Sequence, residues 1–311
     1  MKIAVLDDYQ NVALNLADWS KVKTLAEITV FNDHLADSEA VIKRLLPYDI
    51  ICVMRERTPM TAAILNRLPQ LKLIVSTGGR NASIDLEAAE KNNIKILFTG
   101  YTPKPAIELT WALILGLARN ITSENTSFKN NGWQEKIGAD LNGKTLALLG
   151  LGNIGSEVAL IGKAFGMNLI AWSQNLTVEK AEAAGAKLVT KEELFYQADF
   201  LSVHLVLSPR SKGIVGKNEL ALMKPDSFFI NTSRGPLVDE AALIEVLTNK
   251  KIAGAAVDVY DVEPLTKDHP FRKLDNILAT PHIGYVTKSL YEIFYKDTVA
   301  NILKWCGEGA S

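Results

Sequence analysis

The stretch Thr145-Leu146-Ala147-Leu148-Leu149-Gly150-Leu151-Gly152-Asn153-Ile154-Gly155 decides the fold of this 311-residue chain. Its first five residues are apolar or β-branched and predict a buried strand, and the glycine-spaced half opens a helix expected to continue to Ala164. Gly150 permits the tight turn, Gly152 removes the side chain that would block a pyrophosphate, and Gly155 lets helix and strand pack closely. The stretch therefore predicts a dinucleotide-binding turn, whereas the same glycines without a flanking strand and helix would indicate only a structural turn.

The start of this helix supplies the chemistry that a dinucleotide needs. Amides in the first turn of a helix have no intrahelical acceptor, and the helix dipole places a partial positive charge there. Asn153 and Ile154 occupy that turn. We therefore expect this part of the backbone to face the phosphates of a bound NAD(P).

The whole chain alternates short apolar or β-branched runs with amphipathic segments of helical length, which is typical of parallel α/β layers. The expected strands form two series: 2–6, 28–31, 50–54, 71–75 and 94–98, then 145–149, 169–172, 187–189, 200–204, 227–231, 252–257 and 277–279. Between the series, a strongly apolar helix at about 105–121 begins sharply at Pro103 and Pro105 and resembles a connector between domains. Thr190 followed by Glu193 predicts a capping box.

One amphipathic helix follows Gly284, and a single helix cannot form a domain by itself. We expect it to pack back on the N-terminal series. The sequence therefore predicts two Rossmann-like domains, each a parallel sheet flanked by helices. A substrate-binding domain of residues 1–99 and 284–311 is discontinuous in sequence, and residues 100–283 form the NAD(P)-binding domain.

Charge, cysteine content and the N-terminal sequence favour a protein that binds a small-molecule ligand and is located in the cytoplasm. Lysine and arginine number 34 against 35 aspartates and glutamates, so no net field attracts nucleic acid or an anionic membrane. Cys52 and Cys306 give neither a disulfide framework nor metal-ligand spacing, and no metal site is expected. The N-terminus enters a strand pattern without the features of a signal peptide, and no segment reaches the apolar length of a membrane span.

The position that reads the adenosine ribose carries no acid. An aspartate or glutamate near the end of the second strand of such a domain usually binds the 2′-hydroxyl. Here residues 158–178 contain neither, and the strand ends in Ser173-Gln174-Asn175. Neutral donors do not repel a 2′-phosphate, so NADP(H) is modestly favoured over NAD(H), although no arginine stands there to bind the phosphate. The alternative is that Gln174 and Asn175 form a plain polar turn.

Three further segments fall at or just beyond strand ends: Asn231-Thr232-Ser233-Arg234-Gly235-Pro236-Leu237-Val238-Asp239-Glu240, Asp258-Val259-Tyr260-Asp261-Val262-Glu263-Pro264 and Thr280-Pro281-His282-Ile283-Gly284. In this order behind the glycine turn, they resemble the D-isomer-specific 2-hydroxyacid dehydrogenase family over essentially the whole chain. That family includes phosphoglycerate dehydrogenases, glyoxylate and hydroxypyruvate reductases, and D-lactate dehydrogenases. The resemblance implies an enzyme that moves a hydride between NAD(P)(H) and C2 of a small 2-hydroxy or 2-oxo acid.

The resemblance assigns three catalytic residues. Arg234 matches the arginine that grips the substrate carboxylate, a task suited to a planar, permanently charged fork. His282 matches the acid/base that protonates the 2-oxo oxygen in reduction and removes the hydroxyl proton in oxidation. Glu263 matches its partner, and a carboxylate beside an imidazole stabilises the imidazolium.

Further matches concern the cofactor. Asp258 resembles an aspartate near the nicotinamide carboxamide, and the segment from His204 resembles a loop that passes beside the cofactor. Thr232, next to the carboxylate-binding arginine, is also expected at the cofactor. For Asp258 and the His204 loop, the alternative is a structural role at a strand end.

The substrate side lies in the N-terminal domain. Thr77, Gly78 and Gly79 belong to a loop that resembles the one whose backbone amides receive the substrate carboxylate. Arg55 matches a position that reaches the substrate phosphate in phosphoglycerate dehydrogenases, and it could equally pair with Glu56 or Glu108. In this loop Gly79-Arg80 replaces a more usual Gly-Val or Gly-Leu type, which adds a cation near the pocket.

Two alternative functions remain open. Some members of this family are cofactor-sensing corepressors that bind partner proteins, and fold alone does not distinguish them from enzymes. The presence of Arg234, Glu263 and His282 together favours catalysis. Formate dehydrogenases pair the histidine with glutamine, so Glu263 argues against that reading. We also expect a homodimer.

Overall fold

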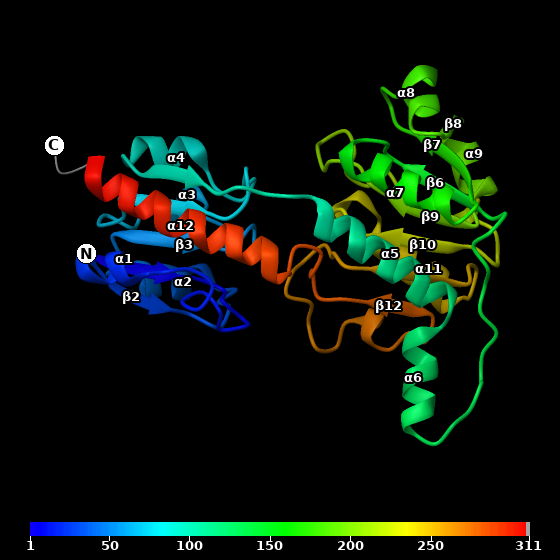
Figure 1. The fold of residues 1–311 in the computed structure, drawn as a ribbon, viewed down its shortest axis with the longest axis horizontal. Helices are drawn as coiled ribbons and strands as arrows, with labels where there is room; N and C mark the ends of the chain where they lie inside the picture. The colour runs from blue at the N-terminus through cyan, green and yellow to red at the C-terminus, as the bar shows by residue number, and fades with distance from the viewer. Residues whose placement is uncertain (309–311) are drawn as a thin grey trace. The chain divides into compact units, whose positions relative to one another are not determined.

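The computed structural model describes residues 1–308 of the chain, which forms two compact units (Figure 1). Unit 1 comprises Met1–Thr102 and the C-terminal segment that starts at Val286, and unit 2 is Pro103–Tyr285. The boundaries expected from the sequence, after residues 99 and 283, fall three and two residues before these. Each unit is a parallel sheet flanked by helices, so the predicted α/β class is confirmed.

Unit 1 contains a five-stranded parallel sheet in the order β2-β1-β3-β4-β5. This is the flavodoxin-like variant of the doubly wound fold, in which the order reverses between β1 and β3. The strands are β1 (Lys2–Val5), β2 (Glu27–Val30), β3 (Ile50–Val53), β4 (Leu73–Ser76) and β5 (Lys95–Phe98). The helices are α1 (Ser20–Leu25), α2 (Ser38–Leu45), α3 (Ala62–Leu65), α4 (Leu86–Lys91) and α12 (Lys288–Glu308).

The C-terminal helix α12 is part of unit 1 although about 190 residues of chain separate it from β5. It contacts α1 and β4, and Leu290, Phe294 and Tyr295 on its inner face are almost completely buried. Asp297 on α12 also accepts a hydrogen bond from the amide of Gly100 at 2.7 Å. Apolar burial on one face of a helix is what fixes such a distant segment to a core.

Unit 2 contains a seven-stranded parallel sheet in the order β12-β11-β10-β9-β6-β7-β8. From β8 to β12 this is the Rossmann order with one added strand, and it reverses between β6 and β9. The strands are β6 (Thr145–Leu149), β7 (Asn168–Trp172), β8 (Lys187–Leu188), β9 (Phe200–Val203), β10 (Phe228–Asn231), β11 (Gly254–Val257) and β12 (Ile277–Ala279). The helices are α5 (Lys104–Ala118), α6 (Ile121–Lys129), α7 (Asn153–Ala164), α8 (Val178–Ala183), α9 (Lys191–Gln197), α10 (Lys217–Ala221), α11 (Glu240–Thr248) and the 3-10 turns η1 (Gly235–Leu237) and η2 (Pro270–Arg272).

Local capping follows the sequence in unit 2. The hydroxyl of Thr190 accepts from the amide of Glu193 at 3.1 Å, and the Glu193 carboxylate accepts from the amide of Thr190 at 2.8 Å. The predicted capping box at the start of α9 is therefore confirmed.

The expected single helix over 105–121 is wrong at its C-terminal end. Helix α5 stops at Ala118, and Asn120 adopts the left-handed conformation with φ +53° before α6 begins. Asparagine tolerates this conformation better than most residues, which explains the break. Helix α5 is also more than a connector, because it packs on α7 and β10–β12 and buries Ile114 completely and Trp111 almost completely.

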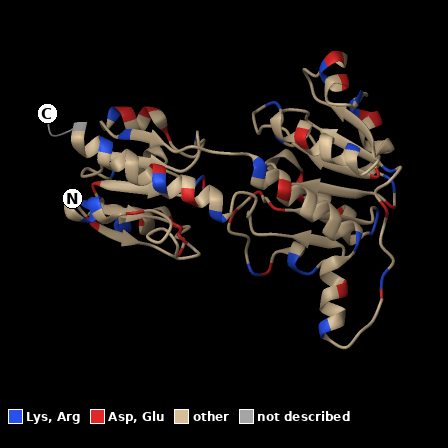
Figure 2. Ribbon diagram, in the orientation of Figure 1, with Lys and Arg blue, Asp and Glu red and all other residues tan. Residues whose placement is uncertain are grey.

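The surface carries charges of both signs over each unit (Figure 2). Among residues 1–308, no helix combines the length and the apolar character required to span a bilayer. Both cysteines are free thiols, and burial raises the pKa of Cys52 to about 12.

The break at Asn120 gives a prediction about stability. Asn120→Ala and Asn120→Gly both remove the hydrogen bond that Asn120 Nδ2 donates to the carbonyl of Ile137 (3.2 Å), but only alanine is strained at φ +53°. We expect the alanine variant to be less stable than the glycine variant by about 1 kcal/mol, or roughly 2–4 °C in the Tm of unit 2. Calorimetry of the two variants checks this, and equal Tm values would contradict it.

Candidate active site

The glycine turn lies at the carboxyl edge of the unit 2 sheet, between β6 and β9, where the strand order reverses. Gly150 has φ +104°, and a Cβ there would lie 2.8 Å from the carbonyl carbon and oxygen of His204. A Cβ on Gly155 would lie 2.2 Å from the carbonyl oxygen of Gly150. Packing within the protein therefore requires both of these glycines.

Gly152 differs from the other two glycines, because no heavy atom lies within 4 Å of the position its Cβ would take. Nothing in the described protein explains a glycine there, and the open space lies at the start of α7. Asn153 and Ile154 begin that helix as the sequence predicts. The open side of Gly152 and the α7 amides fit the pyrophosphate of a dinucleotide.

The end of β7 forms a polar turn in which the amide of Leu176 donates to the carbonyl of Ser173 at 3.1 Å. Ser173 is partly buried, whereas Gln174 and Asn175 are exposed. The turn reading is therefore correct for the backbone, and the three polar side chains still stand at the edge that carries the glycine turn.

His204 follows β9 and borders the glycine turn. Its amide donates to the carbonyl of Leu149 at 2.8 Å, and its Nε2 lies 2.9 Å from the hydroxyl of Ser202. Burial lowers the pKa of His204 to about 4, so the ring is neutral near pH 7. His204 therefore shapes the turn without adding positive charge for phosphates.

Arg234 stands on a loop that the side chain of Asn231 closes at the end of β10. Asn231 Oδ1 accepts from the amide of Ser233 at 3.0 Å, and Asn231 Nδ2 donates to the carbonyl of Arg234 at 3.0 Å. The Arg234 guanidinium donates to the carbonyl of Ser233 at 2.7 Å. The hydroxyl of Thr232 lies 2.8 Å from that of Thr110 on α5, which ties the loop to the helix.

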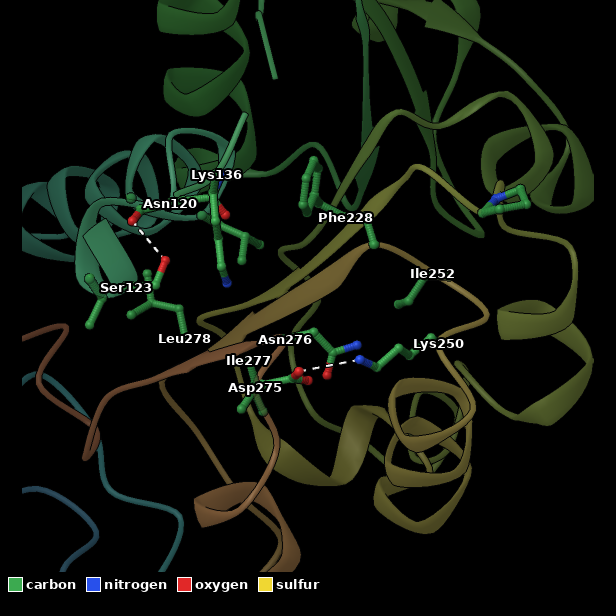
Figure 3. Close-up of a pocket in the computed structure, with 15 residues that line it drawn as sticks. Asn120, Ser123, Lys136, Phe228, Lys250, Ile252, Asp275, Asn276, Ile277 and Leu278 are labelled. Atoms are coloured by element: carbon green, nitrogen blue, oxygen red, sulfur yellow. Dashed lines mark hydrogen bonds and ion pairs between the residues drawn. The ribbon is translucent and has the colours of Figure 1, made fainter. Parts of the chain in front are cut away.

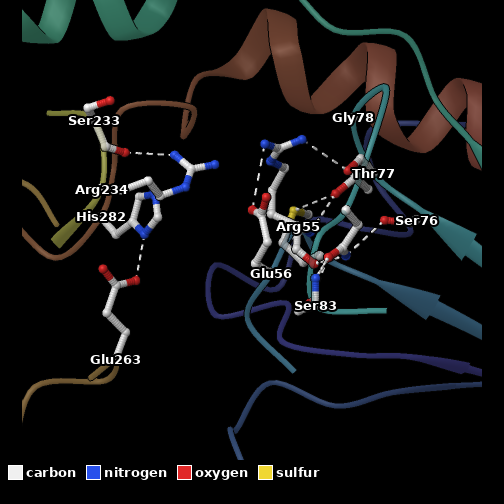
Figure 4. A network of polar contacts seen from close by, with 12 residues as sticks. Arg55, Glu56, Ser76, Thr77, Gly78, Ser83, Ser233, Arg234, Glu263 and His282 are labelled. Carbon is white, nitrogen blue, oxygen red and sulfur yellow. Dashed lines mark hydrogen bonds and ion pairs between the residues drawn. The ribbon is translucent and has the colours of Figure 1, made fainter. Parts of the chain in front are cut away.

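Glu263 and His282 form a contact pair, with Oε2 of Glu263 2.5 Å from Nδ1 of His282 (Figure 4). The other carboxylate oxygen of Glu263 accepts from the amide of Tyr260 at 3.0 Å. The side chains of Glu263 and His282 are 34% and 24% exposed, so both are accessible to a ligand. With Nδ1 directed at Glu263, Nε2 is the ring nitrogen left for proton exchange with a substrate.

Asp258, at the end of β11, holds the segment that carries His282. Its carboxylate accepts from the hydroxyl of Thr280 at 2.6 Å and from the amides of Ile283 and Gly284, each at 2.8 Å. Burial raises the pKa of Asp258, and these hydrogen bonds oppose the shift. The carboxylate that the sequence placed near the cofactor therefore also fixes the turn around His282.

In unit 1, two side chains of the loop after β4 bind the backbone of Arg55, which follows β3. The hydroxyl of Thr77 accepts from the amide of Arg55 at 2.8 Å, and Asn81 Nδ2 donates to the carbonyl of Arg55 at 2.6 Å. The amide of Gly78 already donates to the hydroxyl of Thr99 at 2.7 Å. The space beside Gly79 is open, so its amide is the better candidate to receive a carboxylate.

Arg55 lies across Gly78, because a Cβ on Gly78 would fall 1.8 Å from a guanidinium nitrogen of Arg55. Arg55 itself has φ +51°, and its guanidinium lies 5.2 Å from the centre of the Tyr101 ring. A guanidinium nitrogen of Arg55 also lies 3.6 Å from a carboxylate oxygen of Glu56, one of the two partners expected for it (Figure 4).

Sequence reasoning gave no role to Asn81, Asn231 and Tyr260, which fix the backbone around these sites. Asn231 ends strand β10, and Tyr260 lies three residues after the end of β11. Polar residues at the carboxyl ends of parallel strands often belong to a binding site, so this position in the sequence could have identified both residues.

A cavity of about 400 Å³ lies elsewhere in unit 2 (Figure 3). Its lining includes Phe228, Ile252 and Asn276, which stand at or just before the amino ends of β10, β11 and β12. Parallel strands put these residues at the sheet edge opposite the glycine turn. This cavity is therefore separate from the candidate active site.

The chain was compared with known proteins. The family model "D-isomer specific 2-hydroxyacid dehydrogenase, NAD binding domain" matches residues 111–284. D-3-phosphoglycerate dehydrogenase of Methanocaldococcus jannaschii is 39% identical over 254 residues, which cover 80% of this chain and 48% of that protein. Hydroxypyruvate reductase of Thermotoga maritima is 35% identical over 286 residues, which cover 90% of this chain and 92% of that protein.

A solved structure described as a phosphoglycerate oxidoreductase from Vibrio cholerae o395 aligns with a TM-score of 0.94 and 39% identity, over 99% of both chains. The chain spans about half the length of the Methanocaldococcus jannaschii and Synechocystis D-3-phosphoglycerate dehydrogenases that it matches. The chain belongs to the D-isomer specific 2-hydroxyacid dehydrogenase family.

Proposed function

We propose that the chain catalyses NAD(P)-dependent hydride transfer at C2 of a small D-2-hydroxy acid or the corresponding 2-oxo acid. The observation that carries the proposal is the contact between Glu263 and His282, at the carboxyl edge of the same sheet that presents the glycine turn. We assign cofactor binding to unit 2 and substrate binding mainly to the β3 and β4 loops of unit 1. The names of the relatives support glyoxylate, hydroxypyruvate or 3-phosphoglycerate chemistry.

In the reductive direction, bound NAD(P)H supplies the hydride that C2 receives. Arg234 binds the substrate carboxylate and orients the 2-oxo group. Protonated His282 donates its Nε2 proton to the 2-oxo oxygen as negative charge develops there. Glu263, 2.5 Å from Nδ1, stabilises the imidazolium before transfer and fixes the ring orientation. In oxidation the neutral ring removes the hydroxyl proton.

A reductase screen tests this function. We expect the protein to reduce at least one of glyoxylate, hydroxypyruvate, pyruvate and 3-phosphohydroxypyruvate with NADPH or NADH. His282→Ala should lower kcat about 100-fold or more and leave the cofactor Kd within about twofold, because it removes only the acid/base group.

The matched control is His34→Ala. His34 also contacts a carboxylate, with Nδ1 2.9 Å from Oδ1 of Asp7, but it lies outside the proposed site. This variant should keep kcat within about twofold of wild type. Failure of every 2-oxo acid with both cofactors would overturn the catalytic proposal and favour a cofactor-sensing binding protein.

For the cofactor, we propose a modest preference for NADPH. Ser173 replaces the acid that would repel a 2′-phosphate, and Gln174 and Asn175 expose neutral donors beside it. Neutral donors contribute less than a guanidinium, so we expect about a tenfold preference in kcat/KM, near 1.4 kcal/mol. Ser173→Asp should reverse that preference, because its carboxylate accepts from the ribose hydroxyls and repels the phosphate.

The control for this substitution is Asn168→Asp, which adds the same charge at the opposite end of β7. Its NADPH to NADH ratio should stay within about twofold of wild type at fixed ionic strength, where salt screening is equal for all variants. A wild-type preference for NADH, or an unchanged ratio in Ser173→Asp, would show that Ser173 does not read the ribose.

We also propose that the protein is a homodimer whose interface includes α6 and the loop that follows it. This segment exposes large apolar side chains, with Phe128 66%, Trp133 74% and Ile137 99% exposed. Apolar clusters of this kind mark association surfaces, and closed two-fold symmetry lets one protomer cover the same segment of the other.

We also propose a cytoplasmic location, because the two free thiols suit a reducing compartment. Cell fractionation would test this location.

Sedimentation equilibrium tests the interface. The wild type should sediment as a dimer, and a Phe128→Ser, Trp133→Ser double variant should shift toward monomer by at least about tenfold in Kd, because two aromatic anchors are lost. Leu160→Ser, at another exposed apolar position (62%), should remain dimeric. A monomeric wild type, or a double variant that stays fully dimeric, would contradict the proposal.

A further inference from the structure

Tyr260 contacts the segments of both members of the Glu263–His282 pair. Its amide donates to Oε1 of Glu263 at 3.0 Å, and its hydroxyl donates to the carbonyl of Thr280 at 2.8 Å. The residue is 7% exposed, and its ring packs against that of Phe271 with 6.2 Å between centroids. Through its amide and its hydroxyl, Tyr260 thus joins the loop that carries Glu263 to the turn that carries His282.

The carbonyl that Tyr260 contacts also defines the backbone of His282. The amide of His282 donates to the same Thr280 oxygen at 3.0 Å, which closes a tight turn with His282 at φ +51°. This conformation is disfavoured for a residue with a side chain, so surrounding contacts must hold it. Asp258 holds the Thr280 hydroxyl and the amides after the turn, whereas Tyr260 holds the carbonyl inside it.

The backbone of Tyr260 also borders the loop that carries Arg234. A Cβ on Gly235 would lie 2.0 Å from the carbonyl carbon of Tyr260, so only glycine fits after Arg234 at this approach. Burial and the carboxylates of Asp258 and Glu263 raise the pKa of Tyr260 far above its ordinary value. Its hydroxyl therefore remains protonated, and so a donor, near neutral pH.

We propose that Tyr260 is a positioning residue for catalysis, which keeps the His282 imidazole aligned with Glu263 by holding the Thr280 carbonyl. This inference rests on the proposed function, since it concerns the acid/base step assigned to His282. Without the hydroxyl, the Thr280 carbonyl keeps only the His282 amide as a donor, and the turn rotates more freely. Proton transfer is sensitive to such misalignment, whereas carboxylate binding by Arg234 is not.

Tyr260→Phe tests the proposal, because it removes one hydroxyl and leaves the ring packing and the amide contact to Glu263. We expect kcat to fall about tenfold, with KM for the 2-oxo acid and the cofactor Kd within about twofold of wild type. Tyr196→Phe, which removes a hydroxyl from a 48% exposed tyrosine on α9, should match wild type.

A double-mutant cycle separates positioning from general destabilisation. In a Glu263→Gln background, where the charged partner of the imidazole is already lost, Tyr260→Phe should lower kcat by less than about twofold. An equal tenfold loss in both backgrounds would assign Tyr260 a merely structural role, and an unchanged kcat in Tyr260→Phe alone would also overturn the proposal.

A spectroscopic readout keeps this result independent of the activity screen. The chain has four histidines, so selective ¹⁵N labelling resolves the Nδ1 proton of His282, which His282→Ala assigns. We expect that proton to exchange with water at least about tenfold faster in Tyr260→Phe than in wild type, and at the wild-type rate in Tyr196→Phe. Equal exchange in all three proteins would overturn the inference even if no 2-oxo acid is reduced, whereas inactivity alone would count only against the proposed function.

Discussion

The buried carboxylate of Asp258 is the interaction on which the candidate catalytic geometry depends. A charge so deeply buried costs several kcal/mol unless hydrogen bonds replace its hydration. Here three donors from Thr280, Ile283 and Gly284 do so, and all of them belong to the segment around His282. The same bonds that stabilise the carboxylate therefore fix a histidine at positive φ, which would otherwise relax. Catalytic geometry and local stability are thus properties of one contact set.

The sheet places this contact set at the same edge as the glycine turn. Strands β6, β9, β10, β11 and β12 are consecutive and parallel in the sheet, so the segments after them lie along one edge. The close approach of Gly150 to the His204 backbone shows how tightly the first two of these segments pack. Gly152 is the exception, with open space on its Cβ side. Packing accounts for two of the three glycines, and the proposed dinucleotide would account for the third.

The sequence predicted the elements well and the side-chain contacts less well. In residues 1–308, each of the twelve strands begins and ends within two residues of the bounds expected from the sequence. Runs of apolar residues and the turn residues that follow them are local signals, which explains this agreement. The end of α5 was missed, since Asn120 is equally compatible with a helix until its φ is known. The order of the unit 1 sheet follows from crossovers that local pattern does not encode.

The same limit applies to the site. Arg234, Glu263 and His282 were identified from motifs, but the role of Tyr260 depends on a backbone carbonyl twenty residues away. Every residue has a backbone carbonyl, so the residue types in the sequence do not indicate which carbonyl accepts this hydrogen bond. Likewise, the amide of Gly78 was a reasonable carboxylate donor until Thr99 was seen to occupy it.

In unit 1, the reversal point of the sheet differs from the loop after β4 in how far protein groups fill it. Doubly wound sheets bind ligands where the order reverses, here between β1 and β3. In this chain that point is filled by protein groups: Asp7 accepts from Thr58 at 2.6 Å and contacts His34 at 2.9 Å, and Arg57 donates to its carbonyl at 2.6 Å. Those polar groups are satisfied internally, whereas the space beside Gly79 after β4 is open, as the proposed substrate loop requires.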